Sequence, residues 1–119
     1  IYGDGNQTRS FCYVEDLING FLKLMESNDT GPLNLGNPNE ISIHKLANKI
    51  KSKINNNLNT IHKPLPKDDP KKRKPDITKA KEILNWEPQF DLDLGLDLTI
   101  EYFKNVVQKW KVRLKIFAV

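Results

Sequence analysis

Apolar residues recur at helical spacing in four separate segments, and only short stretches between them have strand character. The four segments cover residues 15–27, 42–54, 77–84 and 92–110, with apolar side chains three and four positions apart. Breaker-rich stretches such as NDTGP at 28–32 and GNP at 36–38 separate the first two segments. The interleaving predicts an α/β fold in which helices dominate and the strands are too short to form a sheet without a neighbour.

Four stretches between the helices have the composition of short strands. Residues 1–5 read as the end of a strand that runs into a glycine turn, and residues 10–14, 32–35 and 60–63 read as brief strands. Ser42 and Asp76 stand just before helical segments, so we expect them to cap those helices through unpaired backbone N–H groups. Gly3 and Gly5 suit a turn with positive φ.

The apolar content is modest, at 38% of the 119 residues, so we expect a small core. We expect four aromatic residues to lie in it: Phe21, Trp86, Phe103 and Trp110. The one cysteine, Cys12, excludes an intramolecular disulfide and reads as a buried thiol. No apolar run approaches the roughly 20 residues that a membrane-spanning helix needs.

The net charge of +4 is unevenly distributed along the chain. Its densest basic run is KKRK at 71–74, flanked by acidic residues on both sides. A nucleic-acid-binding face is usually wider and carries aromatic side chains, so we expect no nucleic-acid partner. His44 and His62 are far apart and no Cys or His cluster has ligand spacing, so we expect no metal site.

Three segments in order resemble the C-terminal, substrate-binding part of the extended short-chain dehydrogenase/reductases that act on sugar nucleotides. They are YGDGNQTRSFCYVEDL at 2–17, GPLNLGNP at 31–38, and PLPKDDPKKRKPDITKAK at 64–81, which LNWEP at 84–88 extends. The resemblance covers roughly residues 1–105 and is strongest to the UDP-glucuronate decarboxylase (UDP-xylose synthase) subfamily. The first segment is also shared with dehydratases and epimerases.

The resemblance implies that the chain is one part of an enzyme with two parts. Family members bind NAD through a glycine-rich fingerprint in an N-terminal Rossmann-type part, which also carries the catalytic Tyr-x-x-x-Lys pair, and neither motif occurs here. We therefore interpret residues 1–110 as the C-terminal substrate-binding lobe, 111–119 as a tail without an assigned structure, and the N-terminal part as absent. Alone, the chain is expected to show no turnover, and NAD would be bound by the absent part.

The resemblance also points to substrate-binding residues. Arg9 matches an arginine that faces the sugar nucleotide in relatives, and it is the one residue for which a catalytic part is considered. Arg73 matches an arginine that reaches the diphosphate or ribose from the opposite side. A guanidinium can bridge phosphate or carboxylate oxygens with paired donors. The same likeness adds Tyr2, Gly3 and Gln7 to the nucleotide pocket, whereas ordinary surface arginines and a generic glycine turn remain the alternatives.

The expected function is the sugar-nucleotide-binding part of an enzyme that converts UDP-glucuronate to UDP-xylose and carbon dioxide with bound NAD. The alternatives are a lobe of a dTDP-glucose 4,6-dehydratase or a UDP-sugar epimerase, a non-catalytic nucleotide-binding module, and a basic helical adaptor. The family implies a UDP-sugar substrate and a homodimer, and we expect no membrane contact from this segment. We expect a cytoplasmic location, or the Golgi lumen if an anchor lies upstream.

Overall fold

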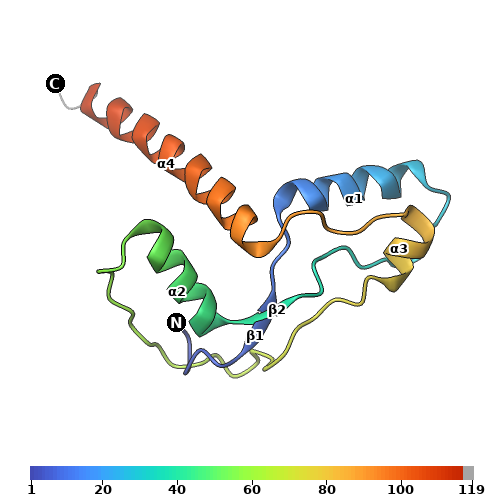
Figure 1. Ribbon diagram of the computed structural model, residues 1–119, viewed down its shortest axis with the longest axis horizontal. Helices are drawn as coiled ribbons and strands as arrows, with labels where there is room; N and C mark the ends of the chain where they lie inside the picture. The colour runs from blue at the N-terminus through green and yellow to red at the C-terminus, as the bar shows by residue number, and fades with distance from the viewer. Residues whose placement is uncertain (117–119) are drawn as a thin grey trace.

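The computed structural model describes residues 1–116, and side chains through residue 108. These residues form four helices and two three-residue strands, with one strand before each of the first two helices (Figure 1). The elements are β1 (Thr8–Ser10), α1 (Val14–Glu26), β2 (Glu40–Ser42), α2 (Ile43–Ile54), α3 (Thr78–Leu84) and α4 (Leu92–Ile116). This order confirms the expectation of helices interleaved with very short strands.

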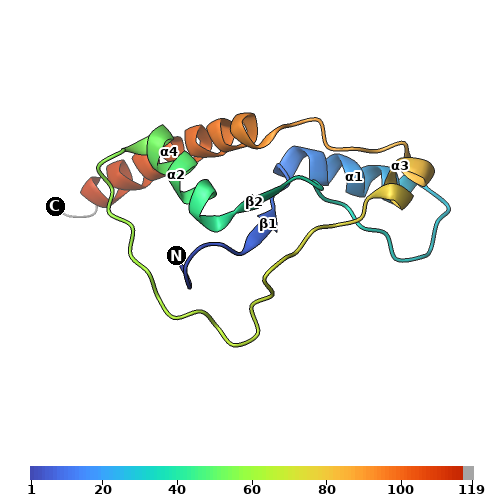
Figure 2. The same cartoon turned by 60° about the horizontal axis from the view of Figure 1, so that its bottom comes forward.

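The two strands form a small antiparallel ribbon between two pairs of helices. Arg9 lies opposite Ile41 in this ribbon, and Thr8 lies opposite Ser42. On one side of the ribbon α1 packs against α3, and on the other α2 packs against α4 (Figures 1 and 2). A long loop joins α2 to α3 and passes below the ribbon, where Tyr2 forms a parallel bridge with Lys63.

The core lies between α1 and α3. Its buried members are Ile77, Ala80, Leu84 and Trp86, with Leu24, Leu33 and Leu35 packed against them. The Trp86 indole N–H donates to the Asp16 carbonyl at 3.0 Å. The Asp16 carboxylate, itself buried, accepts the backbone N–H groups of Gln89 and Phe90 at 2.9 and 3.0 Å. These bonds fasten the start of α1 to the segment between α3 and α4.

The expected aromatic core is only partly present. Trp86 is 2% exposed, which confirms its prediction, but Phe21 is 49% and Phe103 56% exposed, so those two predictions are wrong. Helix α1 meets the core through Gly20 and Leu24, and its remaining apolar face is left without a covering element among residues 1–116. The side chain of Trp110 lies outside those that the structure describes. Cys12 is partly buried.

The strand predictions were the least accurate. β1 ends at Ser10, and the chain enters α1 at Val14, where residues 10–14 were expected to be a strand. Residues 32–35 form no strand, because Leu33 and Leu35 pack on the apolar core instead of pairing with a neighbour. In the 60–63 stretch only Lys63 makes a bridge. β2 was not predicted, since three residues carry too little pattern to identify a strand.

Helix boundaries followed the sequence more closely. The Ser42 hydroxyl accepts the Lys45 N–H at 3.3 Å and caps α2, as expected. The Asp76 carboxylate accepts the N–H of Thr78 at 3.0 Å, and this bond lowers the pKa of Asp76. The N-cap position of α3 is nevertheless Ile77, because the helix begins at Thr78, one residue later than expected. α4 continues beyond the expected end at residue 110, to Ile116. Within residues 1–116, none of the helices combines the length and apolar character needed to cross a bilayer.

Candidate functional site

The glycine turn before β1 has the geometry that its sequence predicts. Gly3 and Gly5 adopt φ of +69° and +80°, a region that side-chain-bearing residues rarely occupy. A β-carbon on Gly5 would lie 3.2 Å from the Ile1 side chain and from His44. Asp4, between them, accepts two bonds from Asn6, which lower the pKa of its carboxyl. The turn is therefore closely packed against the start of α2.

Arg9 is anchored at both ends of its guanidinium group. Its Nη1 donates to the carbonyl of Thr8 at 2.7 Å, and its Nη2 forms an ion pair with Oδ1 of Asp69. The Arg9 side chain is only 17% exposed and that of Asp69 27%. Arg9 thus differs from an ordinary surface arginine, since two contacts at different nitrogens fix the plane of the group.

The loop that carries Arg73 runs directly alongside β1. The Thr8 N–H donates to the carbonyl of Lys71 at 3.0 Å, and the Ser10 hydroxyl donates to the carbonyl of Arg73 at 3.4 Å. The Arg73 side chain is exposed. The fold therefore brings the backbones of the two predicted arginines together, although Arg9 is turned toward Asp69 while Arg73 faces solvent.

The other predicted residues belong to the same turn. The Gln7 amide donates to the carbonyl of Tyr2 at 2.7 Å, so this side chain closes the turn. The Gly3 N–H donates to the carbonyl of Lys63 at 2.8 Å. Tyr2 is 53% exposed, which leaves its ring accessible. The five predicted residues are therefore all located at β1, the turn before it, or the loop beside it.

Two features near this site were not recognised in the sequence. The first is Asp69, whose pairing with Arg9 joins residues 60 positions apart. The second is a pocket of about 440 Å³ beside the ribbon, lined by Thr8, Phe11, Asn37, Asn39 and Lys45 among others. The position of Asp69 inside a basic loop was a signal of a functional role, but no local pattern indicates that it pairs with Arg9.

The exposed basic side chains of the loop favour an oxyanion as the ligand of this site. Between residues 67 and 76 the loop carries five basic and three acidic side chains, and the basic ones are exposed. Among the side chains that the structure describes, no group of three His, Cys, Asp or Glu residues is arranged to hold a metal ion. The Cys12 thiol is partly buried, and this burial, assisted by nearby Asp16, raises its pKa.

Comparison with known proteins identifies the family. The family model described as GDP-mannose 4,6 dehydratase matches residues 1–99. The chain belongs to this family. Its membership and its structural neighbours also place it among the extended short-chain dehydrogenase/reductases, as the sequence motifs predicted. The α/β fold expected for that group is thereby confirmed.

The curated relatives of the chain include UDP-glucuronic acid decarboxylases. The chain is 50% identical to UDP-glucuronic acid decarboxylase 2 of Arabidopsis thaliana over 107 residues. This match covers 90% of the chain and 24% of the relative. The chain is 47% identical over 108 residues to UDP-glucuronic acid decarboxylase 1 of Danio rerio, which covers 91% of this chain and 26% of the relative. The chain therefore spans about a quarter of the length of these relatives.

Solved structures of similar shape include epimerases. UDP-glucose 4-epimerase of Thermotoga maritima, solved with UDP-glucose, has a TM-score of 0.85 and 36% identity, covering 90% of this chain and 35% of the epimerase. UDP-glucuronic acid 4-epimerase of Bacillus cereus, solved with UDP-glucuronic acid and NAD, has a TM-score of 0.75 and 28% identity. That match covers 89% of this chain and 35% of the epimerase.

Proposed function

We propose that this chain is the UDP-sugar-binding part of a UDP-glucuronate decarboxylase, with Tyr2, Gly3, Gln7, Arg9 and Arg73 in the site. The observation that carries the proposal is the position of Arg9. Its guanidinium is largely buried and fixed in β1, and the loop with Arg73 is hydrogen-bonded along the same strand. The identity of about 50% to decarboxylases supports the choice of reaction.

The chemistry of the substrate suits this cluster. UDP-glucuronate presents a diphosphate and a sugar carboxylate, and arginine binds such oxyanions through paired N–H donors. Arg9 has five N–H donors, of which the contacts to Thr8 and Asp69 use two, so three remain for a ligand. Anchoring the group beforehand lowers the entropy that it loses when the substrate binds.

The sequence lacks the two motifs through which family members bind NAD and act on the sugar. A dinucleotide fingerprint places its glycines between a strand and a helix, whose N-terminus receives the diphosphate. Here the glycine turn leads into β1 instead, and no such fingerprint or Tyr-x-x-x-Lys pair occurs in the 119 residues. We assign no residue to NAD, and propose that residues 1–110 bind and orient the sugar nucleotide as a lobe of a homodimeric enzyme.

An epimerase lobe is the second candidate. The high structural similarity to UDP-glucose 4-epimerase favours it, and the glycine turn with its arginine would bind a UDP-sugar in the same way. The two candidates differ in the reaction that a completed enzyme performs. A chimaera separates them, in which this chain replaces the matching C-terminal segment of the Arabidopsis decarboxylase.

The first experiment is a calorimetric titration of the chain with UDP-glucuronate. We expect binding heat from the native chain and about a 100-fold weaker association for Arg9→Ala, because charge-assisted bonds to a partly buried guanidinium are lost. Arg9→Lys should recover only part of the affinity, since it restores the charge without the planar fork. Lys104→Ala, which removes an exposed charge on α4, is the matched control and should bind as the native chain does.

The chimaera then tests the reaction. We expect it to release carbon dioxide and form UDP-xylose from UDP-glucuronate, and to lose both with Arg9→Ala. Formation of the 4-epimer without carbon dioxide would support the epimerase alternative. Absence of UDP-glucuronate binding by both the chain and the chimaera would contradict the proposal as a whole.

A further inference from the structure

We infer that Asp69 is a positioning residue of the sugar-nucleotide site, which holds the Arg9 guanidinium ready for an oxyanion of the substrate. This inference rests on the proposed function and adds a residue to it. Asp69 and Arg9 lie 60 positions apart, and their ion pair joins the 66–75 loop to the middle of β1. Both side chains are more than two-thirds shielded from solvent.

The contact fixes an orientation that Arg9 could not hold alone. A long arginine side chain has several rotatable bonds and loses rotamer freedom when it is ordered. The Thr8 carbonyl restrains Nη1, and Asp69 restrains Nη2 at the other arm of the fork. With both arms restrained, the three remaining N–H groups have defined directions. The group is therefore ordered before any ligand arrives.

The same contact sets the position of the loop. Asp69 begins a series of attachments along β1, followed by the carbonyl of Lys71 on the Thr8 N–H and the carbonyl of Arg73 near the Ser10 hydroxyl. The attachments come from every second residue of the loop, as in an extended strand. The Asp69 N–H also donates to the carbonyl of Pro66 at 3.3 Å, which closes a turn just before them. The position of Arg73 thus depends on the same anchor.

Electrostatic repulsion and positioning predict opposite effects of Asp69 on the affinity for the substrate. Asp69 is an anion beside a site proposed to bind an anion, so removal of its charge should strengthen binding if Coulomb repulsion were its main contribution. Positioning predicts weaker binding when the anchor is removed. The sign of the change therefore distinguishes the two, and the neighbouring residue Asp68 provides a matched control. Asp68 is exposed and forms no ion pair with the side chains that the structure describes.

The experiment measures UDP-glucuronate affinity of the 119-residue chain by calorimetry. We expect about tenfold weaker binding for Asp69→Ala, from the lost preorganisation. Asp68→Ala, with the same change in charge, should bind as tightly as the native chain or slightly more tightly. Asp69→Asn keeps the shape and an acceptor oxygen, so it should restore most of the affinity. Circular dichroism and thermal melts of each variant check that the fold is retained.

A double-mutant cycle provides the decisive measurement. If Asp69 acts through Arg9, then Asp69→Ala should cause no further loss in a chain that already carries Arg9→Ala. Equal affinities of Asp69→Ala and Asp68→Ala would overturn the inference, as would independent, additive losses in the cycle. Binding that requires Arg9 but not Asp69 would overturn this inference and leave the proposed function in place. Absence of binding by the native chain would remove both.

Discussion

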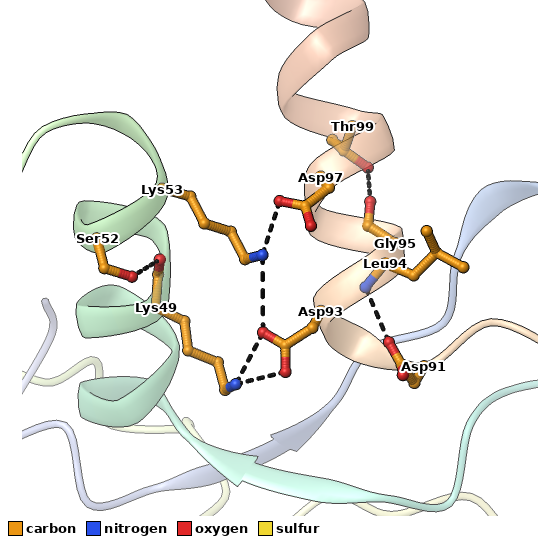
Figure 3. A network of polar contacts seen from close by, with 9 residues as sticks. All are labelled: Lys49, Ser52, Lys53, Asp91, Asp93, Leu94, Gly95, Asp97 and Thr99. Carbon is orange, nitrogen blue, oxygen red and sulfur yellow. Dashed lines mark hydrogen bonds and ion pairs between the residues drawn. The ribbon is translucent and has the colours of Figure 1, made fainter.

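The two helix pairs on either side of the ribbon are held together by different forces. α1 and α3 enclose an apolar cluster in which Trp86 is 2% exposed. α2 and α4 are joined by charges: Lys49 pairs with Asp93 at 2.6 Å, and Lys53 pairs with Asp97 at 2.7 Å and with Asp93 at 3.8 Å (Figure 3). Figure 3 shows both lysines extending from α2 toward the acidic side chains of α4.

The difference shows which contacts stabilise the fold and which only orient its parts. Burial of apolar surface contributes about 25 cal/mol for each Å² removed from water. Exposed ion pairs contribute little, because water and salt screen them and two long side chains must be ordered. Asp93 and Asp97 are 55% and 59% exposed. We therefore expect the apolar pair to determine stability and the charged pair to influence mainly the direction of α4.

The largest effect should follow from truncation of the central aromatic residue. Trp86→Ala should lower the free energy of unfolding by about 3–5 kcal/mol, which is a large share of the total in a small domain. Urea titration followed by circular dichroism measures this change. Trp86→Phe keeps most of the apolar contact but loses the indole bond to the Asp16 carbonyl, so its loss should be clearly smaller. Equal losses would show that the hydrogen bond outweighs packing.

An intermediate effect should follow from removal of the buried carboxylate. Asp16→Ala leaves the N–H groups of Gln89 and Phe90 without their acceptor and should cost about 1–3 kcal/mol. Glu15→Ala, at the exposed neighbouring position, is the control and should change stability little. Chemical denaturation of both variants tests the difference. If they were equally stable, Asp16 would have no special part in joining α1 to the segment before α4.

The smallest effect should come from the charged helix pair. Asp97→Asn removes the partner of Lys53, and we expect only a slight decrease in melting temperature, which 1 M salt should abolish by screening. Glu101→Gln, one turn further along α4 at an exposed position, is the matched control. A decrease as large as that for Trp86→Ala would reverse the ranking of the two helix pairs.

The charged pair should also respond to pH in a defined way. The bond with Lys49 lowers the pKa of Asp93 below the usual 3.8. The contribution of Asp93 to stability is therefore present above pH 3.8 and is lost as the pH falls through the folded-state pKa. The bond with Asp97 raises the pKa of Lys53 above 10.5. The contribution of Lys53 to stability is therefore present below pH 10.5 and is lost as the pH rises through the folded-state pKa. The difference in melting temperature between the native chain and Asp97→Asn should therefore decrease as the pH rises above 10.5.

Helices and caps were predictable from this sequence because their signals are local. The apolar spacing, the Ser42 cap and the bond between Asp76 and Thr78 depend on residues within one turn of each other. Strands of three residues were not predictable, since pairing partners such as Arg9 and Ile41 lie far apart in the sequence. The exposure of Phe21 was missed for a similar reason. An apolar stripe shows that a face is suited to burial, but does not show whether another element covers it.

In the candidate site, too, local features were predictable and a long-range contact was not. The segment with Arg9 and the basic loop with Arg73 were both recognisable, because each is a distinctive run of residues. The ion pair between Arg9 and Asp69 was not, since it is formed only when the loop folds back on β1. The sequence therefore indicated the residues suited to oxyanion binding but not the residue that holds one of them in place.

The alternating order of the two helix pairs has a consequence for how the chain could be divided. α1 and α2 precede the long loop, whereas their partners α3 and α4 follow it. A protease that cleaves at the exposed Lys67 would thus yield two pieces, each with one member of both pairs. Neither piece contains a complete helix pair, so the two should remain associated after cleavage, and pieces produced separately should reassemble on mixing.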